Sequence, residues 1–126
     1  MRAIATEHAP TPVGPYSQAI ASGELIFTAG QLGIDPASGE LLQGEIEDEV
    51  SQALRNLAAV LAAGDSALAR VLRTSVYVSD LSLFQRINAV YARFFPDSPQ
   101  PARSTGEVAA LPMGARFEID AIATRG

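Results

Sequence analysis

The sequence contains no cysteine and no lysine, and its only histidine is His8. The absence of cysteine excludes disulfides, thiol nucleophiles, iron–sulfur clusters and cysteine zinc sites. The absence of lysine excludes Schiff-base chemistry on a lysine side chain. A single histidine excludes any metal site that needs several imidazoles. We expect His8 to be a loop residue, so the candidate chemical groups are arginine, carboxylates, hydroxyls and amides.

Positive charge is also scarce. All nine cations are arginine, and they face 14 carboxylates, which gives a net charge of −5. Nucleic acids and anionic membranes attract a basic face, so we expect neither as a partner. No stretch approaches the roughly 20 apolar residues of a membrane span. The first residues lack the apolar run of a signal peptide, and we expect a cytoplasmic location.

The length and the apolar content suit one packed domain over residues 1–126, because 48% of the 126 residues are hydrophobic. Helical spacing of apolar residues predicts helices at 46–63 and 82–94, and the acidic run Glu45–Glu49 is expected to be a solvated helix start. Alternation and β-branched residues predict six strands, at 2–6, 17–21, 24–29, 70–79, 103–110 and 115–124.

This order of elements predicts an α+β two-layer sandwich, in which one mixed β-sheet carries both helices on one face. So small a chain cannot cover the other face of the sheet by itself. We therefore expect further copies of the chain to pack there.

The last two expected strands carry charged residues that suit a small acid. The strand 115–124 alternates Glu118 and Asp120 with four apolar residues, Phe117, Ile119, Ala121 and Ala123. If 103–110 and 115–124 form a hairpin, Arg103 and Glu118 are diagonal neighbours on one face, roughly 7–8 Å apart at the backbone. Arginine offers a planar fork of donors to a carboxylate, and glutamate can deprotonate water or protonate a leaving amine. The alternative is an ordinary surface ion pair between the two.

The same region resembles the C-terminal signature of the RidA/YjgF family of imine deaminases, also described as L-PSP endoribonucleases. The likeness runs through Pro101–Pro112 and Phe117–Ala123. Three earlier segments are similar to the family in the same order, namely Gly14–Ala19, Thr28–Leu32 and Ile87–Tyr91. Four matching segments in the correct order make the resemblance specific, and it extends over nearly the whole chain.

The resemblance implies a chorismate-mutase-like fold and a homotrimer with three sites at clefts between subunits. It also implies hydrolysis of 2-aminoacrylate, 2-iminopropionate and related enamine or imine acids to 2-oxo acids and ammonia, with no cofactor and no metal. By this resemblance, Arg103 matches the arginine that holds the substrate carboxylate in the family, and Glu118 matches the acid that positions the attacking water. Tyr16 matches the pocket tyrosine, and Gly30 and Asn88 match positions that line the cleft.

Three positions depart from the family pattern. Thr105 stands where many members have cysteine, and its hydroxyl can still hydrogen-bond a substrate. Gly106 replaces an apolar residue on the face that we expect to be buried, where it should weaken the strand. Phe117 replaces a smaller residue, and we expect its ring to fill the space that Gly106 leaves.

The implied chemistry agrees with the composition, because an imine carbon is electrophilic and water can attack it without a covalent nucleophile. The expected partner is thus a small-molecule carboxylate substrate, and the expected activity is that of a hydrolase of C=N bonds. Three alternatives remain open: a ribonuclease or translation inhibitor, a non-catalytic trimer that binds a small carboxylate, and a hydrolase for a larger imine. Tyr16, Gly30, Asn88 and Thr105 can each also serve structure alone.

Overall fold

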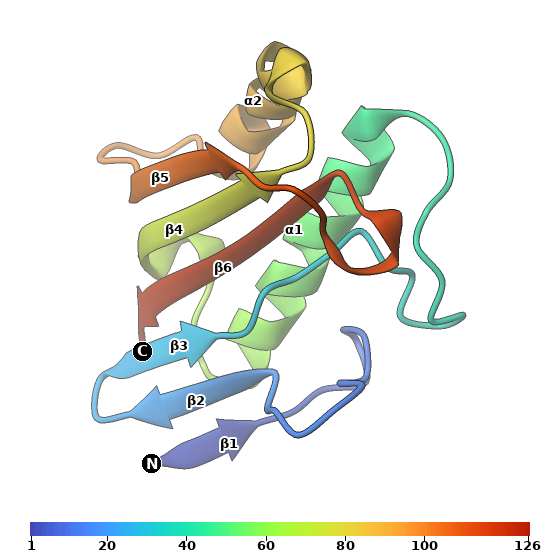
Figure 1. The fold of residues 1–126 in the computed structure, drawn as a ribbon. Helices are drawn as coiled ribbons and strands as arrows, with labels where there is room; N and C mark the ends of the chain where they lie inside the picture. Colours follow the sequence, from blue (N-terminus) through green and yellow to red (C-terminus); the bar gives the residue numbers. More distant parts are fainter.

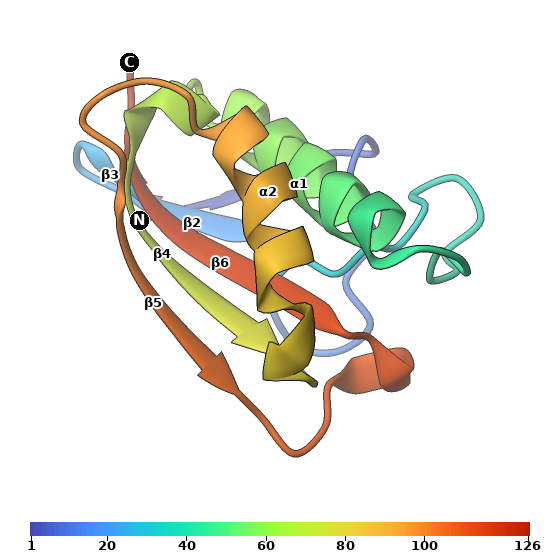
Figure 2. The ribbon, with the colours of Figure 1, turned by 90° about the horizontal axis from the view of Figure 1, so that it is seen from above.

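The computed structural model describes residues 1–126 and forms one mixed sheet with two α-helices on the same side (Figures 1 and 2). The predicted α+β two-layer sandwich is therefore confirmed. The strands lie in the order β1-β2-β3-β6-β4-β5. In chain order the elements are β1 (Arg2–Ile4), β2 (Ala19–Ser22), β3 (Leu25–Thr28), α1 (Ile46–Ala63), β4 (Val71–Val78), α2 (Phe84–Phe94), β5 (Ala102–Glu107) and β6 (Phe117–Thr124), with short 3-10 helices at Leu68–Arg70, Leu81–Leu83 and Pro112–Gly114.

The last strand, β6, lies inside the sheet, between β3 and β4 and antiparallel to both. In contrast, β4 and β5 are parallel neighbours, and α2 connects them. Parallel strands need a crossover connection, which a helix commonly supplies. The segment β4–α2–β5 is such a βαβ unit, and it places β5 at the edge of the sheet.

The expected hairpin between the last two strands is wrong, because β4 separates β5 from β6. Thr105 lies opposite Val76, where the hairpin would have put it opposite Glu118. After β5 the chain passes the end of β4 through residues 108–116 before it enters β6 (Figure 2). β4 and β6 each have eight residues, and four residues of each strand are buried. In contrast, no residue of β5 is buried. Pairing β4 with β6 therefore removes more apolar surface from water than pairing β5 with β6.

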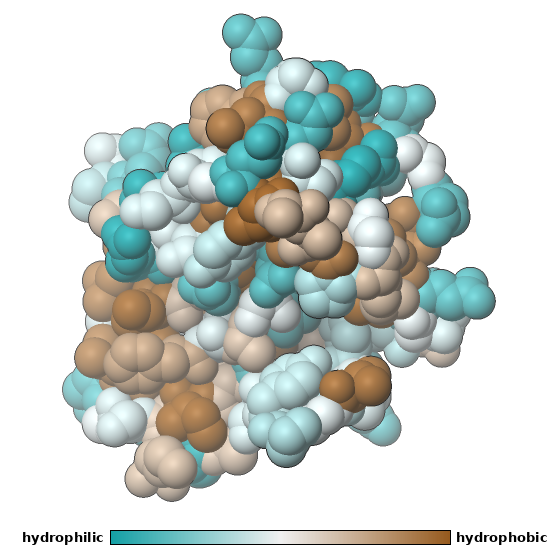
Figure 3. Space-filling view, in the orientation of Figure 1, coloured by the Kyte–Doolittle hydropathy of each residue, from teal (hydrophilic) through white to brown (hydrophobic).

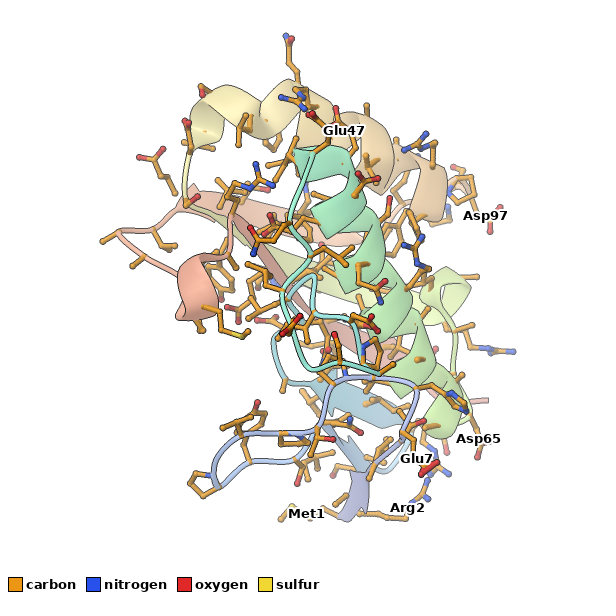
Figure 4. The ribbon with its side chains drawn as sticks, turned by 90° about the vertical axis from the view of Figure 1, so that its right-hand side faces the viewer. Met1, Arg2, Glu7, Glu47, Asp65 and Asp97 are labelled. Carbon is orange, nitrogen blue, oxygen red and sulfur yellow. The ribbon has the colours of Figure 1, made fainter.

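The core lies between α1 and the inner face of β6. The helix runs from near Glu47 to just before Asp65, both marked in Figure 4. Its apolar stripe is fully buried at Ile46, Val50, Leu54, Leu57 and Leu61, at the spacing of an amphipathic helix. The strand supplies alternate residues to the same core, as predicted: Phe117, Ile119, Ala121 and Ala123. Neither α-helix of the structure has the length and apolar character that a membrane crossing requires.

One carboxylate of the run Glu45–Glu49 is buried, contrary to the expectation that the whole run is solvated. Glu49 is 1% exposed and accepts hydrogen bonds from the backbone N of Arg116 at 2.7 Å and from its Nε at 2.8 Å. A buried carboxylate loses its hydration, and charge-assisted hydrogen bonds compensate for that loss. Because Arg116 directly precedes β6, this ion pair fixes the start of β6 against α1.

The face of the sheet opposite the helices is open, as expected. Apolar side chains gather there over β2, β3 and the adjoining end of β6 (Figure 3). They belong to Ile20, Leu25, Phe27 and Ile122, and Phe27 is 43% exposed. Packing of further copies of the chain on this face stays a prediction.

Gly106 lies on the open face, so its expected place on the buried face is wrong. It pairs with Tyr77, whose other neighbour is Glu118, so these three residues form a row across three strands. Phe117 is fully buried on the helix side of the sheet. The two residues point to opposite faces, and the ring of Phe117 therefore does not fill the space beside Gly106.

Replacing Glu49 should destabilise the fold. We expect Glu49→Ala to lower the free energy of unfolding by about 2–3 kcal/mol, because it removes two hydrogen bonds to a charged, buried acceptor. Urea denaturation measures this loss. The matched control is Glu47→Ala on the same helix, which removes an exposed partner of Arg86 and should cost clearly less. Equal losses in the two variants would show that the buried pair has no special weight.

Candidate functional site

The largest cavity of the chain, of about 640 Å³, has the carboxyl group of Glu118 in its wall. The cavity is lined by the segment before β2, the segment after β3 and the turn before β6. Two residues expected at the site, Tyr16 and Gly30, also line it. Further lining residues escaped the sequence analysis because nothing local marks them, among them Val13, Gln31 and Met113.

A short backbone pairing brings Gly30 against Glu118. Gln31 donates to the carbonyl of Ile119 at 2.7 Å and accepts from its amide at 3.1 Å. The preceding Gly30 therefore faces Glu118, and a Cβ at residue 30 would overlap the Glu118 carboxyl group. Any larger residue at position 30 would therefore require the Glu118 side chain to move from its observed position.

The loop that carries Tyr16 is held by the buried amide of Gln18. Its Oε1 accepts from the backbone of Thr6 at 2.7 Å, and its Nε2 donates to the carbonyls of Thr6 at 3.1 Å and Pro10 at 2.9 Å. Tyr16 itself is 55% exposed at the mouth of the cavity. The buried Gln18 amide thus ties the segment two residues after Tyr16 to the start of the same loop at Thr6 and Pro10.

Burial raises the pKa of the Glu118 carboxyl above its ordinary value of 4.5, and the negative charge of nearby Asp120 adds to the rise. The carboxylate forms no ion pair and accepts no hydrogen bond within the chain. A desolvated carboxyl without a cationic partner holds its proton to higher pH. Such a group can both take up and release a proton closer to neutral pH than an exposed glutamate can.

Arg103 lies on the other face of the sheet, so the expected same-face pair of Arg103 and Glu118 is wrong for a single chain. Arg103 pairs with Thr74, which points into the core beneath the helices, whereas Glu118 pairs with Tyr77 on the open face. The Arg103 Nη1 donates to Oδ1 of Asn88 at 2.7 Å. Its guanidinium carbon lies 4.7 Å from the centre of the Tyr91 ring.

The residues expected at the site thus fall into two groups on opposite faces of the sheet. Glu118, Gly30 and Tyr16 line the large cavity. Arg103, Asn88 and Thr105 lie on the helix side; the first two line a second cavity of about 370 Å³ beside α2. The Thr105 hydroxyl is buried there and has no hydrogen-bond partner in the chain. No three histidine, aspartate or glutamate side chains converge as a metal site would require.

Comparison with known proteins places the chain in a family. The family model described as endoribonuclease L-PSP matches residues 6–125, and the chain belongs to this family, the RidA/YjgF family. It is 42% identical over 125 residues to the human 2-iminobutanoate/2-iminopropanoate deaminase, covering 99% of this chain and 90% of that protein. It is 43% identical over 121 residues to the chloroplastic Reactive Intermediate Deaminase A of Arabidopsis thaliana, covering 96% of this chain and 64% of that relative's length.

Solved structures share the fold over the whole chain. A crystal structure of a protein from Thermotoga maritima is 44% identical and superposes with a TM-score of 0.96, covering 100% of this chain and 98% of that one. The structure of Escherichia coli TdcF with bound serine is 34% identical, with a TM-score of 0.95 and full coverage of both chains.

The titration of Glu118 tests the electrostatics of the cavity. We expect carboxyl-carbon NMR to give a pKa above 4.5, and Asp120→Asn to lower it without restoring 4.5, because burial contributes more than Asp120 does. Because the pKa is raised in the folded state, Glu118 contributes fully to the free energy of unfolding at pH values below its unfolded-state pKa. This contribution is lost as the pH rises through the folded-state pKa. A pKa at or below 4.5 in the wild type contradicts this description.

Proposed function

We propose that this protein is a deaminase that hydrolyses imine and enamine forms of small 2-amino acids, such as 2-iminopropionate and 2-aminoacrylate, to 2-oxo acids and ammonia. The observation that carries the proposal is the unpaired, half-buried carboxyl group of Glu118 in the wall of a cavity of about 640 Å³. The deaminase names of the human and Arabidopsis relatives support the reaction class.

In the proposed reaction the Glu118 carboxylate accepts a proton from water as the water oxygen bonds to the imine carbon. Starting from the protonated imine, this addition gives a tetrahedral carbon with hydroxyl and amino groups. Glu118 returns the proton to the amino nitrogen. As the C–N bond breaks and ammonia leaves, the hydroxyl gives its proton to Glu118 and becomes the carbonyl of the 2-oxo acid. An enamine first takes a proton on its β-carbon and becomes the imine. Orientation and proton transfer carry this reaction, so we propose that it needs no cofactor.

Arg103 is proposed to hold the substrate carboxylate through a two-pronged hydrogen bond. Because Arg103 and Glu118 of one chain face opposite sides of the sheet, one small substrate reaches both only if they come from different chains. We therefore propose sites between neighbouring subunits of a homotrimer. The open, partly apolar face around Phe27 is the surface that neighbouring subunits would cover. The cytoplasmic location expected from the sequence stays a prediction.

A second candidate is a trimer that binds a small carboxylate without turnover, which the serine bound in the TdcF structure favours. That function needs Arg103 but not a proton-transferring Glu118. RNA cleavage, which the family description names, is less compatible with a chain of net charge −5 that has no lysine.

Turnover assays separate these functions. An amino-acid oxidase acting on alanine generates 2-iminopropionate, and its conversion to pyruvate is followed with and without this protein. Arg103→Ala should lose at least about 100-fold in kcat/KM, because it removes a charged, two-pronged contact to the substrate. Glu118→Gln should lose turnover while still binding pyruvate. The control is Arg86→Ala, which removes an exposed arginine of α2 outside both cavities. Full activity of Arg103→Ala contradicts the proposed function, and full biological effect of Glu118→Gln favours the binding module.

Mixed trimers test whether two chains build each site. Arg103→Ala and Glu118→Gln subunits, unfolded together and refolded at equal ratio, should regain turnover at about one quarter of the sites, since each site then draws one intact residue from each of two chains. Arg103→Ala subunits refolded alone, and Glu118→Gln subunits refolded alone, should show no turnover. If one chain supplied both residues, the mixture would be as inactive as its components.

A further inference from the structure

Three residues on one face of α2 meet the guanidinium of Arg103. Phe84, Asn88 and Tyr91 follow one another at four- and three-residue intervals, which aligns them along the helix. The guanidinium carbon lies 5.4 Å from the centre of the Phe84 ring and 4.7 Å from that of Tyr91. Asn88 accepts a hydrogen bond from Nη1 at 2.7 Å. A stripe of three side chains along α2 therefore contacts the guanidinium of one half-buried arginine.

The Tyr91 ring, the nearer of the two to Arg103, is fixed by a hydrogen bond to the sheet. The Tyr91 hydroxyl and the Thr74 hydroxyl share a hydrogen bond of 2.8 Å, and both residues are buried. Thr74 is also the residue of β4 that pairs with Arg103 in β5. Thr74 therefore fixes the position of the Tyr91 ring, against which Arg103 lies. A shift of this ring would leave the buried Thr74 hydroxyl unpaired.

These contacts occupy only part of the guanidinium. Nη1 donates to Asn88, whereas Nε and Nη2 donate no hydrogen bond within the chain. Nε and Nη2 together form the side-on edge that binds both oxygens of a carboxylate. A cavity of about 370 Å³ lies beside this arginine and leaves room for a ligand.

We propose that Phe84, Asn88 and Tyr91 are positioning residues, which orient the Arg103 guanidinium so that its Nε–Nη2 edge is presented to the substrate carboxylate. This inference rests on the proposed function for the identity of the ligand. It gives Asn88 a role beyond lining the cleft, because its Oδ1 accepts a hydrogen bond from Arg103. It also gives Tyr91, a buried aromatic residue of α2, a place in substrate binding.

A purely structural role of Phe84, Asn88 and Tyr91 would tolerate different substitutions from a positioning role. Aromatic rings that only cover the arginine stem would contribute to stability, and any apolar side chain of similar size would replace them. A positioning role requires an aromatic face over the cation and a neutral acceptor at position 88. Substitutions that keep the volume but lose the aromatic face therefore distinguish the two.

The test measures pyruvate binding by calorimetry, and kcat and KM with 2-iminopropionate, on the assembled protein. We expect Tyr91→Leu and Asn88→Ala each to raise the pyruvate Kd and the KM about tenfold, with kcat within about twofold, since a contact to the unreacting carboxylate acts equally in the ground and transition states. Tyr91→Phe keeps the ring over the cation but loses the hydrogen bond to Thr74, so its Kd and KM should fall between those of the wild type and those of Tyr91→Leu. Asn88→Asp keeps the acceptor but places a negative charge beside the carboxylate, so it should weaken binding more than Asn88→Ala.

The matched control is Gln85→Ala, an exposed position of α2 that touches neither Arg103 nor its cavity. The Nε–H signal of Arg103, assigned by its loss in Arg103→Ala, gives a second readout. It should move when Leu replaces Tyr91, because the ring current is removed, and it should move on adding pyruvate to the wild type. If Tyr91→Leu does not fold, Asn88→Ala and Phe84→Leu decide, because both positions are half-buried.

Unchanged pyruvate Kd in both Asn88→Ala and Phe84→Leu overturns the inference, as does a wild type that does not bind pyruvate. Normal turnover of the wild type with unchanged KM in the variants overturns the inference and leaves the proposed function intact. A wild type that binds pyruvate with the expected variant pattern, but turns over no imine, overturns the proposed function and leaves the positioning role intact.

Discussion

The alternation of side chains along β4, β5 and β6 is the constraint on which the rest of the site depends. Residues that pair across neighbouring strands share a face, and a change of one residue in register moves a side chain to the other face. Arg103 is in register with Thr74, and Glu118 is in register with Tyr77. Positions 74 and 77 differ by an odd number, so the two charged groups of one chain cannot meet. The chemistry proposed for the protein therefore requires a second chain.

Two glutamates of this small domain, one buried and one half-buried, show how environment separates a compensated carboxylate from one that has no partner. Glu49 is buried more deeply, but Arg116 supplies two hydrogen bonds, and the pair joins α1 to β6. Glu118 is only half-buried, yet it has no cationic partner, and its pKa is raised. Net burial is thus a poor guide to function, whereas a desolvated carboxyl without compensation is a better one. Arg103 shows the same contrast within one side chain. Its Nη1 donates to Asn88, whereas its Nε and Nη2 have no partner within the chain.

Much of the local structure follows from the sequence. Apolar spacing identified both helices within a few residues, and alternation identified which residues of β6 enter the core, among them Phe117 and Ile119. These signals are local, because a helix or a strand shows its buried face in its own residues. The spacing of Phe84, Asn88 and Tyr91 was also present in the sequence, but nothing in it indicated that an arginine from another element would lie against them.

The amino-acid sequence by itself determined the class of fold, the one-sided covering of the sheet and the family. Only the tertiary structure decided that β4 lies between β5 and β6, that Gly106 faces away from the core, and that Arg103 and Glu118 point to opposite faces. The physical reason is that strand pairing is a competition among distant segments for buried apolar surface. A hairpin is favoured by proximity along the chain, but the two eight-residue strands β4 and β6 bury more together than either buries with the edge strand β5.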